Sequence, residues 1–149
     1  MGTNPPNGNE QVQAGELIDM LAQSAFMTMG VLTKLAADND LSLTQLRVLA
    51  ILRDRRLRMS DLVDYLGLEK STLTGLVSRG EKRGLLLRAP SATDGRAVDV
   101  FLSEEGLELG KQLASNLADQ LGPLTDGLNR AERERLRNLL AKMINPPLS

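Results

Sequence analysis

The sequence contains no cysteine and no histidine. These absences exclude disulfides, thiol redox sensing, thiolate or imidazole metal sites, and catalysis by a cysteine nucleophile or a histidine base. An enzyme would have to use carboxylates, lysine or tyrosine, and no paired acidic residues converge in the pattern. We therefore expect a protein that is not an enzyme and that holds no cofactor and no metal.

Aromatic residues are also scarce, at 2% of a chain that is 42% hydrophobic. The core must therefore be aliphatic, which suits the packing of helix against helix. No apolar run approaches the roughly 18 residues of a membrane span, so we expect no membrane partner. Residues 1–9 have neither the basic nor the apolar part of a signal peptide, so we expect a cytoplasmic protein. We expect residues 1–10 to form a disordered tail.

The 149 residues, about enough for one domain with a sizeable core, have a net charge of −1. That value alone argues against a nucleic acid as partner. The charges are unevenly placed, however. Residues 53–96 contain ten Lys or Arg and six Asp or Glu, a net charge of +4, whereas the rest of the chain has −5. A basic central third is the first indication of DNA binding, although ordinary scatter of surface charge would also produce it.

Helical periodicity covers most of the chain. The spacing of apolar residues predicts helices over residues 11–37, 43–52, 60–66, 69–83, 103–121 and 130–144. Ser42 and Gln45 fit a capping box for the second helix, and Ser60 and Asn129 are suitable N-caps for the third and the last. Gly67 occupies a position where a left-handed residue commonly ends a helix.

The helix predicted over residues 69–83, which stops at Gly84, has two different faces. One face is apolar (Leu73, Leu76, Val77), and the other carries small and polar residues, namely Ser71, Thr74, Gly75, Ser78 and Lys82. Small residues allow close approach to another surface, and hydroxyls can reach base edges or phosphates in a major groove. With the short preceding helix and the turn at Gly67, this pattern predicts a helix-turn-helix, although plain structural helix pairs are also common.

Two short apolar runs, Leu85–Leu87 and Ala97–Leu102, flank a polar connector rich in turn-forming residues. A strand, a turn and a returning strand directly after a recognition helix would form a wing. Arg96 lies at its tip and Arg88 at its base, and an arginine on such a hairpin can enter a narrow minor groove. We expect Asp94 to brace Arg96 or the turn. A solvated loop with a routine turn is the alternative.

Several segments, taken in their order and spacing, resemble the MarR family of multiple antibiotic resistance regulators. They are residues 43–49 (LTQLRVL), 60–68 (SDLVDYLGL), 71–74 (STLT), 81–85 (EKRGL), 94–96 (DGR) and 102–106 (LSEEG). The resemblance covers nearly the whole chain after the N-terminal tail. It implies a homodimeric winged helix-turn-helix repressor that binds pseudo-palindromic operators and is often released by a small, frequently phenolic, ligand.

The resemblance also assigns candidate DNA-binding residues. The family's recognition helix matches Ser71, Thr72, Thr74, Gly75, Ser78 and Arg79, and its wing motif matches Asp94 and Arg96; Lys82 and Arg88 complete the predicted site. Ser91, Thr93 and Gly95 stand where family members often have charged residues. The tip of the wing therefore carries fewer charges than in relatives, and the recognition helix would contribute more of the binding.

The expected fold is mainly α with a small β-hairpin wing. It comprises an N-terminal dimerisation helix at residues 11–40, a winged helix-turn-helix DNA-binding lobe at residues 41–102, and C-terminal dimerisation helices at residues 103–149. The terminal helices hold more leucines than a small DNA-reading domain needs. Two intertwined copies would bury them and space the recognition helices about one DNA turn apart. The alternatives are a helical bundle within one chain, or a dimeric protein-interaction module that does not bind DNA.

Family members bind effectors in a crevice between the dimerisation helices and the DNA-binding lobe. In this chain the first helix would provide Met20, Phe26, Met27, Met29 and Gly30, together with parts of the second and fifth helices. Apolar, Met-rich walls suit a small aromatic effector, but methionines at helical spacing more often fill a core. The missing cysteine excludes a peroxide-sensing thiol.

Overall fold

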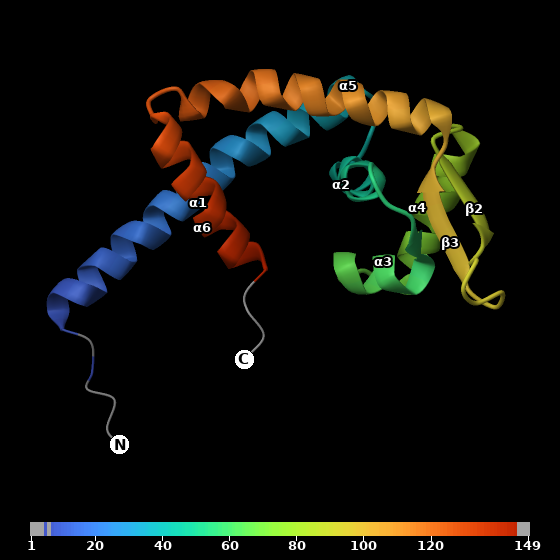
Figure 1. Ribbon diagram of the computed structural model, residues 1–149, viewed down its shortest axis with the longest axis horizontal. Coiled ribbons are helices and arrows are strands. Elements are labelled where there is room, and N and C mark those ends of the chain that lie inside the picture. Colours follow the sequence, from blue (N-terminus) through green and yellow to red (C-terminus); the bar gives the residue numbers. More distant parts are fainter. Residues whose placement is uncertain (1–4, 6, 146–149) are drawn as a thin grey trace.

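The structure, a computed structural model, describes residue 5 and residues 7–145 (Figure 1). These residues are mostly helical, with one small antiparallel sheet. The elements follow the order α1 (Gly8–Asp38), α2 (Leu43–Leu52), β1 (Leu57–Arg58), α3 (Met59–Leu66), α4 (Lys70–Lys82), β2 (Leu86–Pro90), β3 (Val98–Leu102), α5 (Glu104–Leu121), the 3-10 helix η1 (Gly122–Thr125) and α6 (Arg130–Ile144). The fold class expected from the sequence is confirmed.

The described residues form two parts of different shape (Figure 1). α2, α3, α4 and the sheet form a lobe, in which the strand order is β1-β3-β2. α5 packs against α1 and connects this lobe to the end of the molecule where α6 begins. The N-terminal half of α1 therefore extends away from the lobe, and α6 begins at the end of the molecule that is far from the wing.

The core of the lobe is aliphatic, as the composition predicted. Its most deeply buried side chains come from α2, α3, α4 and β3 and are Val48, Leu52, Leu62, Leu73, Val77 and Val100. Full burial of one such side chain stabilises a fold by about 1.5–3 kcal/mol. Because α4 contributes two of these residues, the core fixes this helix along one side and leaves its other side for solvent or a partner.

Polar caps determine where several helices begin and end. At the start of α2, the Gln45 amide donates to Ser42 Oγ (3.1 Å) and the Ser42 amide donates to Gln45 Oε1 (2.8 Å). Asn129 and Glu132 form the same reciprocal pair at the start of α6, at 2.9 and 2.8 Å. Gly67 ends α3 in the left-handed conformation, with a φ of 65°. These three predictions are confirmed.

The N-terminal helix begins earlier than expected. α1 starts at Gly8, and the Asn7 amide donates to Glu10 Oε2 (3.1 Å) at this end. The helix therefore includes the last three residues of the predicted disordered tail, because Asn7 and Glu10 supply a local cap. Residues 1–4 and 6 of that tail, and residues 146–149 of the C-terminal segment, lie outside the described residues.

A strand that the sequence did not predict changes the start of α3. Leu57 and Arg58 form β1 and pair with Val100 and Asp99 of β3. This pairing keeps Arg58 extended, and the helix begins directly after it, so Arg58 is the N-cap residue. The prediction that Ser60 caps this helix is therefore wrong, since Ser60 already lies within the first turn.

The end of α4 leads directly into the wing. Gly84 adopts a left-handed conformation with a φ of 73°. The Gly84 amide donates to the Glu81 carbonyl (2.9 Å) and the Leu85 amide donates to the Gly80 carbonyl (3.0 Å), which is a Schellman motif. Gly80 also lets β2 approach, because a Cβ there would lie 2.6 Å from Leu86 Cδ1. A side chain at position 80 would therefore force Leu86 to shift, and glycine allows the close packing of α4 and β2.

α5 begins against the same junction. The Gly106 amide donates to Ser103 Oγ (3.0 Å), which caps the helix, and the Ser103 amide donates to the Leu85 carbonyl (3.0 Å). That carbonyl lies so close to Gly106 that a Cβ on this residue would overlap it. Gly106 is therefore required for the contact that joins α5 to the start of the wing.

We predict that Gly106→Ala destabilises the fold by at least about 1–3 kcal/mol, because the added methyl group overlaps a backbone oxygen. Gly110→Ala, one turn further along α5, is the matched control. A Cβ at Gly110 would meet Arg53 Cγ and Leu102 Cδ1 at 3.9 Å, which is ordinary contact. Replacing glycine inside a helix gains up to about 1 kcal/mol. Urea unfolding measures both variants, and equal stabilities would contradict the assigned contact at Gly106.

Candidate nucleic-acid interface

α3 and α4 form a helix-turn-helix with Gly67 in the turn. The inner side of α4 is buried, since Leu73 and Val77 are 0% exposed and Leu76 is 4% exposed. The predicted DNA-binding residues of this helix lie outside that apolar side: Ser71, Thr72, Arg79 and Lys82 are exposed, and Thr74, Gly75 and Ser78 are half-buried. The structure thus brings seven predicted site residues together on one helix.

The outer surface of α4 carries small and polar residues in its middle and basic residues at its C-terminal end. Thr74 Oγ1 donates to the Lys70 carbonyl (2.8 Å), which leaves this hydroxyl as an acceptor toward a ligand. A Cβ on Gly75 would lie 3.3 Å from Arg79 Nη1, so the Arg79 guanidinium extends back over Gly75. Arg79 and Lys82 provide the positive charge of the last turn.

β2 and β3 form the predicted hairpin. Its tip is closed by two backbone hydrogen bonds, from the Ser91 amide to the Ala97 carbonyl (2.9 Å) and from the Ala97 amide to the Asp94 carbonyl (3.0 Å). Asp94 Oδ1 accepts a hydrogen bond from the Arg96 amide (3.1 Å). Asp94 therefore braces the turn, which is one of the two roles expected for it, and Arg96 is exposed at the tip.

Arg88 has a different environment from Arg96. Its Nε lies 2.7 Å from Glu81 Oε1, and the two side chains are 36% and 32% exposed. This ion pair connects β2 to α4 and neutralises a carboxylate that would otherwise repel a phosphate near the recognition helix. That Arg88 contacts DNA stays a prediction, and we expect its contribution to be smaller than that of Arg96.

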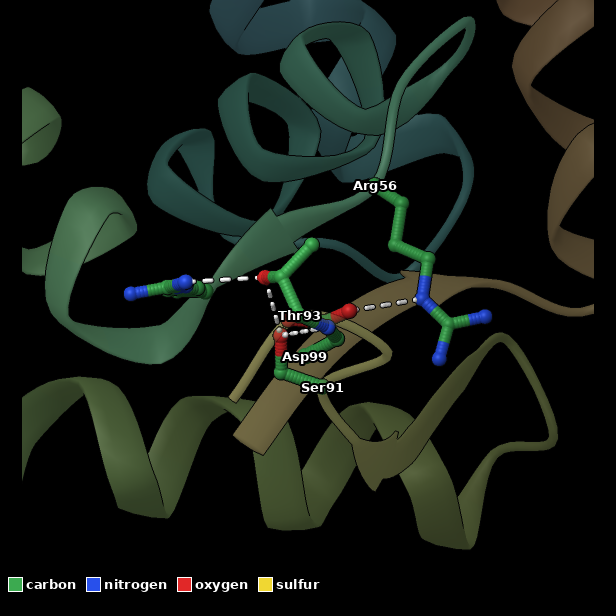
Figure 2. Close-up of polar contacts among 5 residues, drawn as sticks. Arg56, Ser91, Thr93 and Asp99 are labelled. Carbon is green, nitrogen blue, oxygen red and sulfur yellow. Dashed lines mark hydrogen bonds and ion pairs between the residues drawn. The ribbon is translucent and has the colours of Figure 1, made fainter. Parts of the chain in front are cut away.

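A second ion pair, which the sequence did not indicate, supports the other strand of the wing (Figure 2). Arg56 Nε lies 2.9 Å from Asp99 Oδ2, and the Asp99 side chain is 12% exposed. The Arg56 guanidinium carbon also lies 4.3 Å from the centre of the Phe101 ring, a cation–π distance. The segment after α2 is thereby fixed to β3. No local sequence pattern indicates this ion pair, because its residues are 43 positions apart.

A cavity of about 520 Å³ lies between the lobe and the terminal helices. Its walls come from α1, α2, α5 and the turn after α3, and they are mostly leucines, such as Leu46, Leu66 and Leu113. The charged residues of this lining are Arg47 and Arg53, and no carboxylate belongs to it among the described residues. An apolar cavity with two cationic groups suits a small apolar molecule that carries an acidic group.

Exposed apolar side chains cover the outer parts of α1 and α6. This surface, the terminal apolar face, consists of Val12, Leu17, Ile18, Met20, Leu21, Phe26 and Met27 on α1 and Leu136, Leu139, Leu140, Met143 and Ile144 on α6. It includes Met20, Phe26 and Met27, which the sequence placed in the effector crevice, whereas Met29 does line the cavity. Within the described ranges, none of the helices has the length and apolarity needed to cross a membrane.

Comparisons with known proteins agree with this geometry. A MarR family model matches residues 39–97. The HTH-type transcriptional regulator SarZ of Staphylococcus aureus is 32% identical over 117 residues, which cover 74% of this chain and 76% of SarZ. The solved structure of apo MarR from E. coli has a TM-score of 0.68 and 26% identity, and covers 88% of this chain and 96% of that one. BpsR of Bordetella bronchiseptica, whose DNA binding is regulated by 6-hydroxynicotinic acid, has a TM-score of 0.66 and 28% identity, and covers 95% and 99%.

The helix-turn-helix with its hairpin defines a winged helix DNA-binding protein. The chain belongs to the MarR family. It is therefore a DNA-binding transcriptional regulator and not an enzyme, which sets aside the alternative of an interaction module without DNA.

We predict that Arg96→Ala weakens binding to a preferred duplex by roughly 1–3 kcal/mol, because the exposed guanidinium at the wing tip is lost. Arg88→Ala should have less than half of this effect, since Arg88 already pairs with Glu81. Fluorescence anisotropy at constant salt, with a duplex selected from a random-sequence library, compares the two variants. A larger loss for Arg88→Ala than for Arg96→Ala would refute these assignments.

Proposed function

We propose that the chain acts as a homodimer that binds a pseudo-palindromic operator and represses transcription until a small aromatic ligand releases it. The observation that carries this proposal is the terminal apolar face on α1 and α6. Exposed large apolar side chains that gather on two helices mark interaction surfaces in soluble proteins, whereas single scattered ones are normal. A second copy of the chain, paired through a two-fold axis, would bury the same face on both partners.

Such a dimer would carry two DNA-reading lobes. The terminal apolar face lies on α1 and α6, at the end of the molecule opposite the wing, so pairing through it would leave α4 and the wing accessible (Figure 1). Dimeric helix-turn-helix proteins bind half-sites about one helical turn, or 34–36 Å, apart. Binding across two half-sites would block access to the operator. Because its target is DNA, we place the protein in the cytoplasm.

The cavity supports the ligand-responsive part of the proposal. An aromatic acid would place its ring against the leucines and its carboxylate near Arg47 or Arg53, where a charge-assisted hydrogen bond is strong. BpsR is a related protein whose DNA binding responds to an acid of this kind. Leu66 and Leu68, which flank the turn before α4, also line the cavity. A ligand that moves this turn would change the position of the recognition helix.

We predict a particle of twice the 16.2 kDa chain mass in sedimentation equilibrium. Leu139→Glu, at a residue that is 50% exposed on the terminal apolar face, should dissociate it because pairing would bury an unpaired charge. Operator affinity should then fall by more than about tenfold, since each lobe binds its half-site alone. Asn138→Glu adds the same carboxylate one position away, outside the apolar spacing of α6, and should leave the dimer intact. A monomeric wild-type chain would contradict the proposal.

We predict that aromatic acids stabilise the protein and weaken its binding to the operator. At one hundred times its Kd, a ligand that binds only the folded state contributes about 2.7 kcal/mol. Thermal melting with a panel of aromatic acids and their neutral amides tests the role of charge. The acids should bind more tightly, and Arg53→Gln or Arg47→Gln should reduce this preference. If the acids change neither the melting temperature nor DNA affinity, the ligand-responsive part is wrong.

A further inference from the structure

Arg58 was not among the predicted DNA-binding residues, yet its side chain reaches the wing. It is the last residue of β1 and lies opposite Asp99 in the register of the sheet. Its Nη2 donates to Oγ1 of Thr93 at the tip of the wing, at 2.9 Å. The Arg58 guanidinium, on the edge strand β1, is therefore hydrogen-bonded to the wing tip, 35 positions further along the chain.

Thr93 is itself held in place for this contact (Figure 2). The hydroxyl oxygens of Thr93 and Ser91 lie 3.1 Å apart, and the Thr93 amide donates to Ser91 Oγ (3.4 Å). Ser91 is only 7% exposed, so it forms a buried base for these contacts. These contacts with Ser91 hold the Thr93 hydroxyl in place, and this hydroxyl in turn holds one N–H of the Arg58 guanidinium. Arg58 is thus positioned at the wing by two uncharged side chains.

The positive charge of Arg58 is not compensated within the sheet. Asp99, its partner in register, forms its ion pair with Arg56 at 2.9 Å instead. Across residues 7–145, no carboxylate oxygen lies within 4.0 Å of the Arg58 guanidinium. Thr93 takes one of its five N–H donors and contributes no charge. Arg58 is half-buried, and its remaining donors and its charge have no carboxylate partner among the described residues, so they can bind an anion.

We propose that Arg58 binds a phosphate of the DNA backbone beside the groove that Arg96 enters. Arg96 is the only basic residue of the sequence between Ser91 and Ala97, so Arg58 would double the positive charge at the wing tip. A guanidinium forms strong, geometrically defined hydrogen bonds with phosphate. Because one N–H of the guanidinium is bonded to Thr93, Arg58 would not have all the N–H groups of that edge free for a base pair. This proposal rests on the proposed role of the wing in DNA binding.

The test compares Arg58→Gln, Arg58→Lys and Arg55→Gln in the full chain. Arg55 is the matched control, because its exposed guanidinium lies three positions earlier and pairs with Asp54 at 3.7 Å. Anisotropy titrations use the selected duplex and a random-sequence duplex, over about 50–200 mM salt. Arg58→Gln should weaken both duplexes by the same factor, about three- to tenfold, since phosphate contacts carry no sequence information. Its plot of log K against log salt should be shallower by about 0.9.

Arg58→Lys and one further variant, Thr93→Val, separate a DNA contact from support of the fold. Arg58→Lys retains the charge and should therefore retain the wild-type salt slope. If Arg58 only supported the wing, the salt slope would stay unchanged in Arg58→Gln as well. Thr93→Val removes the acceptor, and should weaken binding about two- to fivefold in the wild-type chain but very little in Arg58→Gln, because coupled residues are not additive. Melting temperatures identify any variant that loses stability.

The possible outcomes distinguish this proposal from the one it rests on. An unchanged salt slope in Arg58→Gln, or an equal loss of affinity in Arg55→Gln, would overturn the role of Arg58. If Arg96→Ala weakens binding while Arg58→Gln does not, the wing still binds DNA and only the present proposal is refuted. A wild-type chain that binds neither duplex would refute both.

Discussion

The close contact between Gly80 on α4 and Leu86 on β2 fixes the geometry on which the DNA-reading surface depends. A recognition helix and a wing can engage one duplex together only if the distance and angle between them are constant. The missing side chain of Gly80 lets Leu86 pack directly onto the helix, where it is 2% exposed. The left-handed Gly84 then turns the chain from the helix into the strand. Leu73 and Val77, on the same buried side of α4 as Gly80, hold the helix against the core.

Ion pairs inside the lobe determine which charges face outward. Glu81 belongs to the recognition helix α4 and Asp99 to the wing strand β3, and each is paired with an arginine, Arg88 and Arg56 respectively. These carboxylates therefore oppose a phosphate only weakly, whereas cations such as Arg96 remain exposed. The acidic excess of the chain lies outside residues 53–96. A net charge of −1 is thus compatible with DNA binding, because local charge and not the total acts on the duplex.

The features that could be predicted from the sequence are those that depend on neighbouring residues. Helix caps at Ser42 and Asn129 use partners three positions away, and the two faces of α4 follow from helical geometry alone. β1 could not be predicted, because a strand of two residues has no periodicity and its partners lie about 40 positions further on. The wrong prediction that Ser60 caps α3 has the same cause, because the pairing of β1 with β3 determines where this helix begins. The ion pair of Arg88 and the hydrogen bond of Arg58 depend on how the sheet packs, which no local pattern encodes.

Selection of bound duplexes from a random-sequence library tests most directly whether two copies of this lobe read DNA together. The geometry of a two-fold dimer with one recognition helix on each copy predicts enrichment of an inverted repeat. Its half-sites should be separated by about 10–10.5 base pairs from centre to centre, or by a multiple of this distance. Enrichment of a single site without symmetry, or no enrichment at all, would contradict DNA reading by paired lobes.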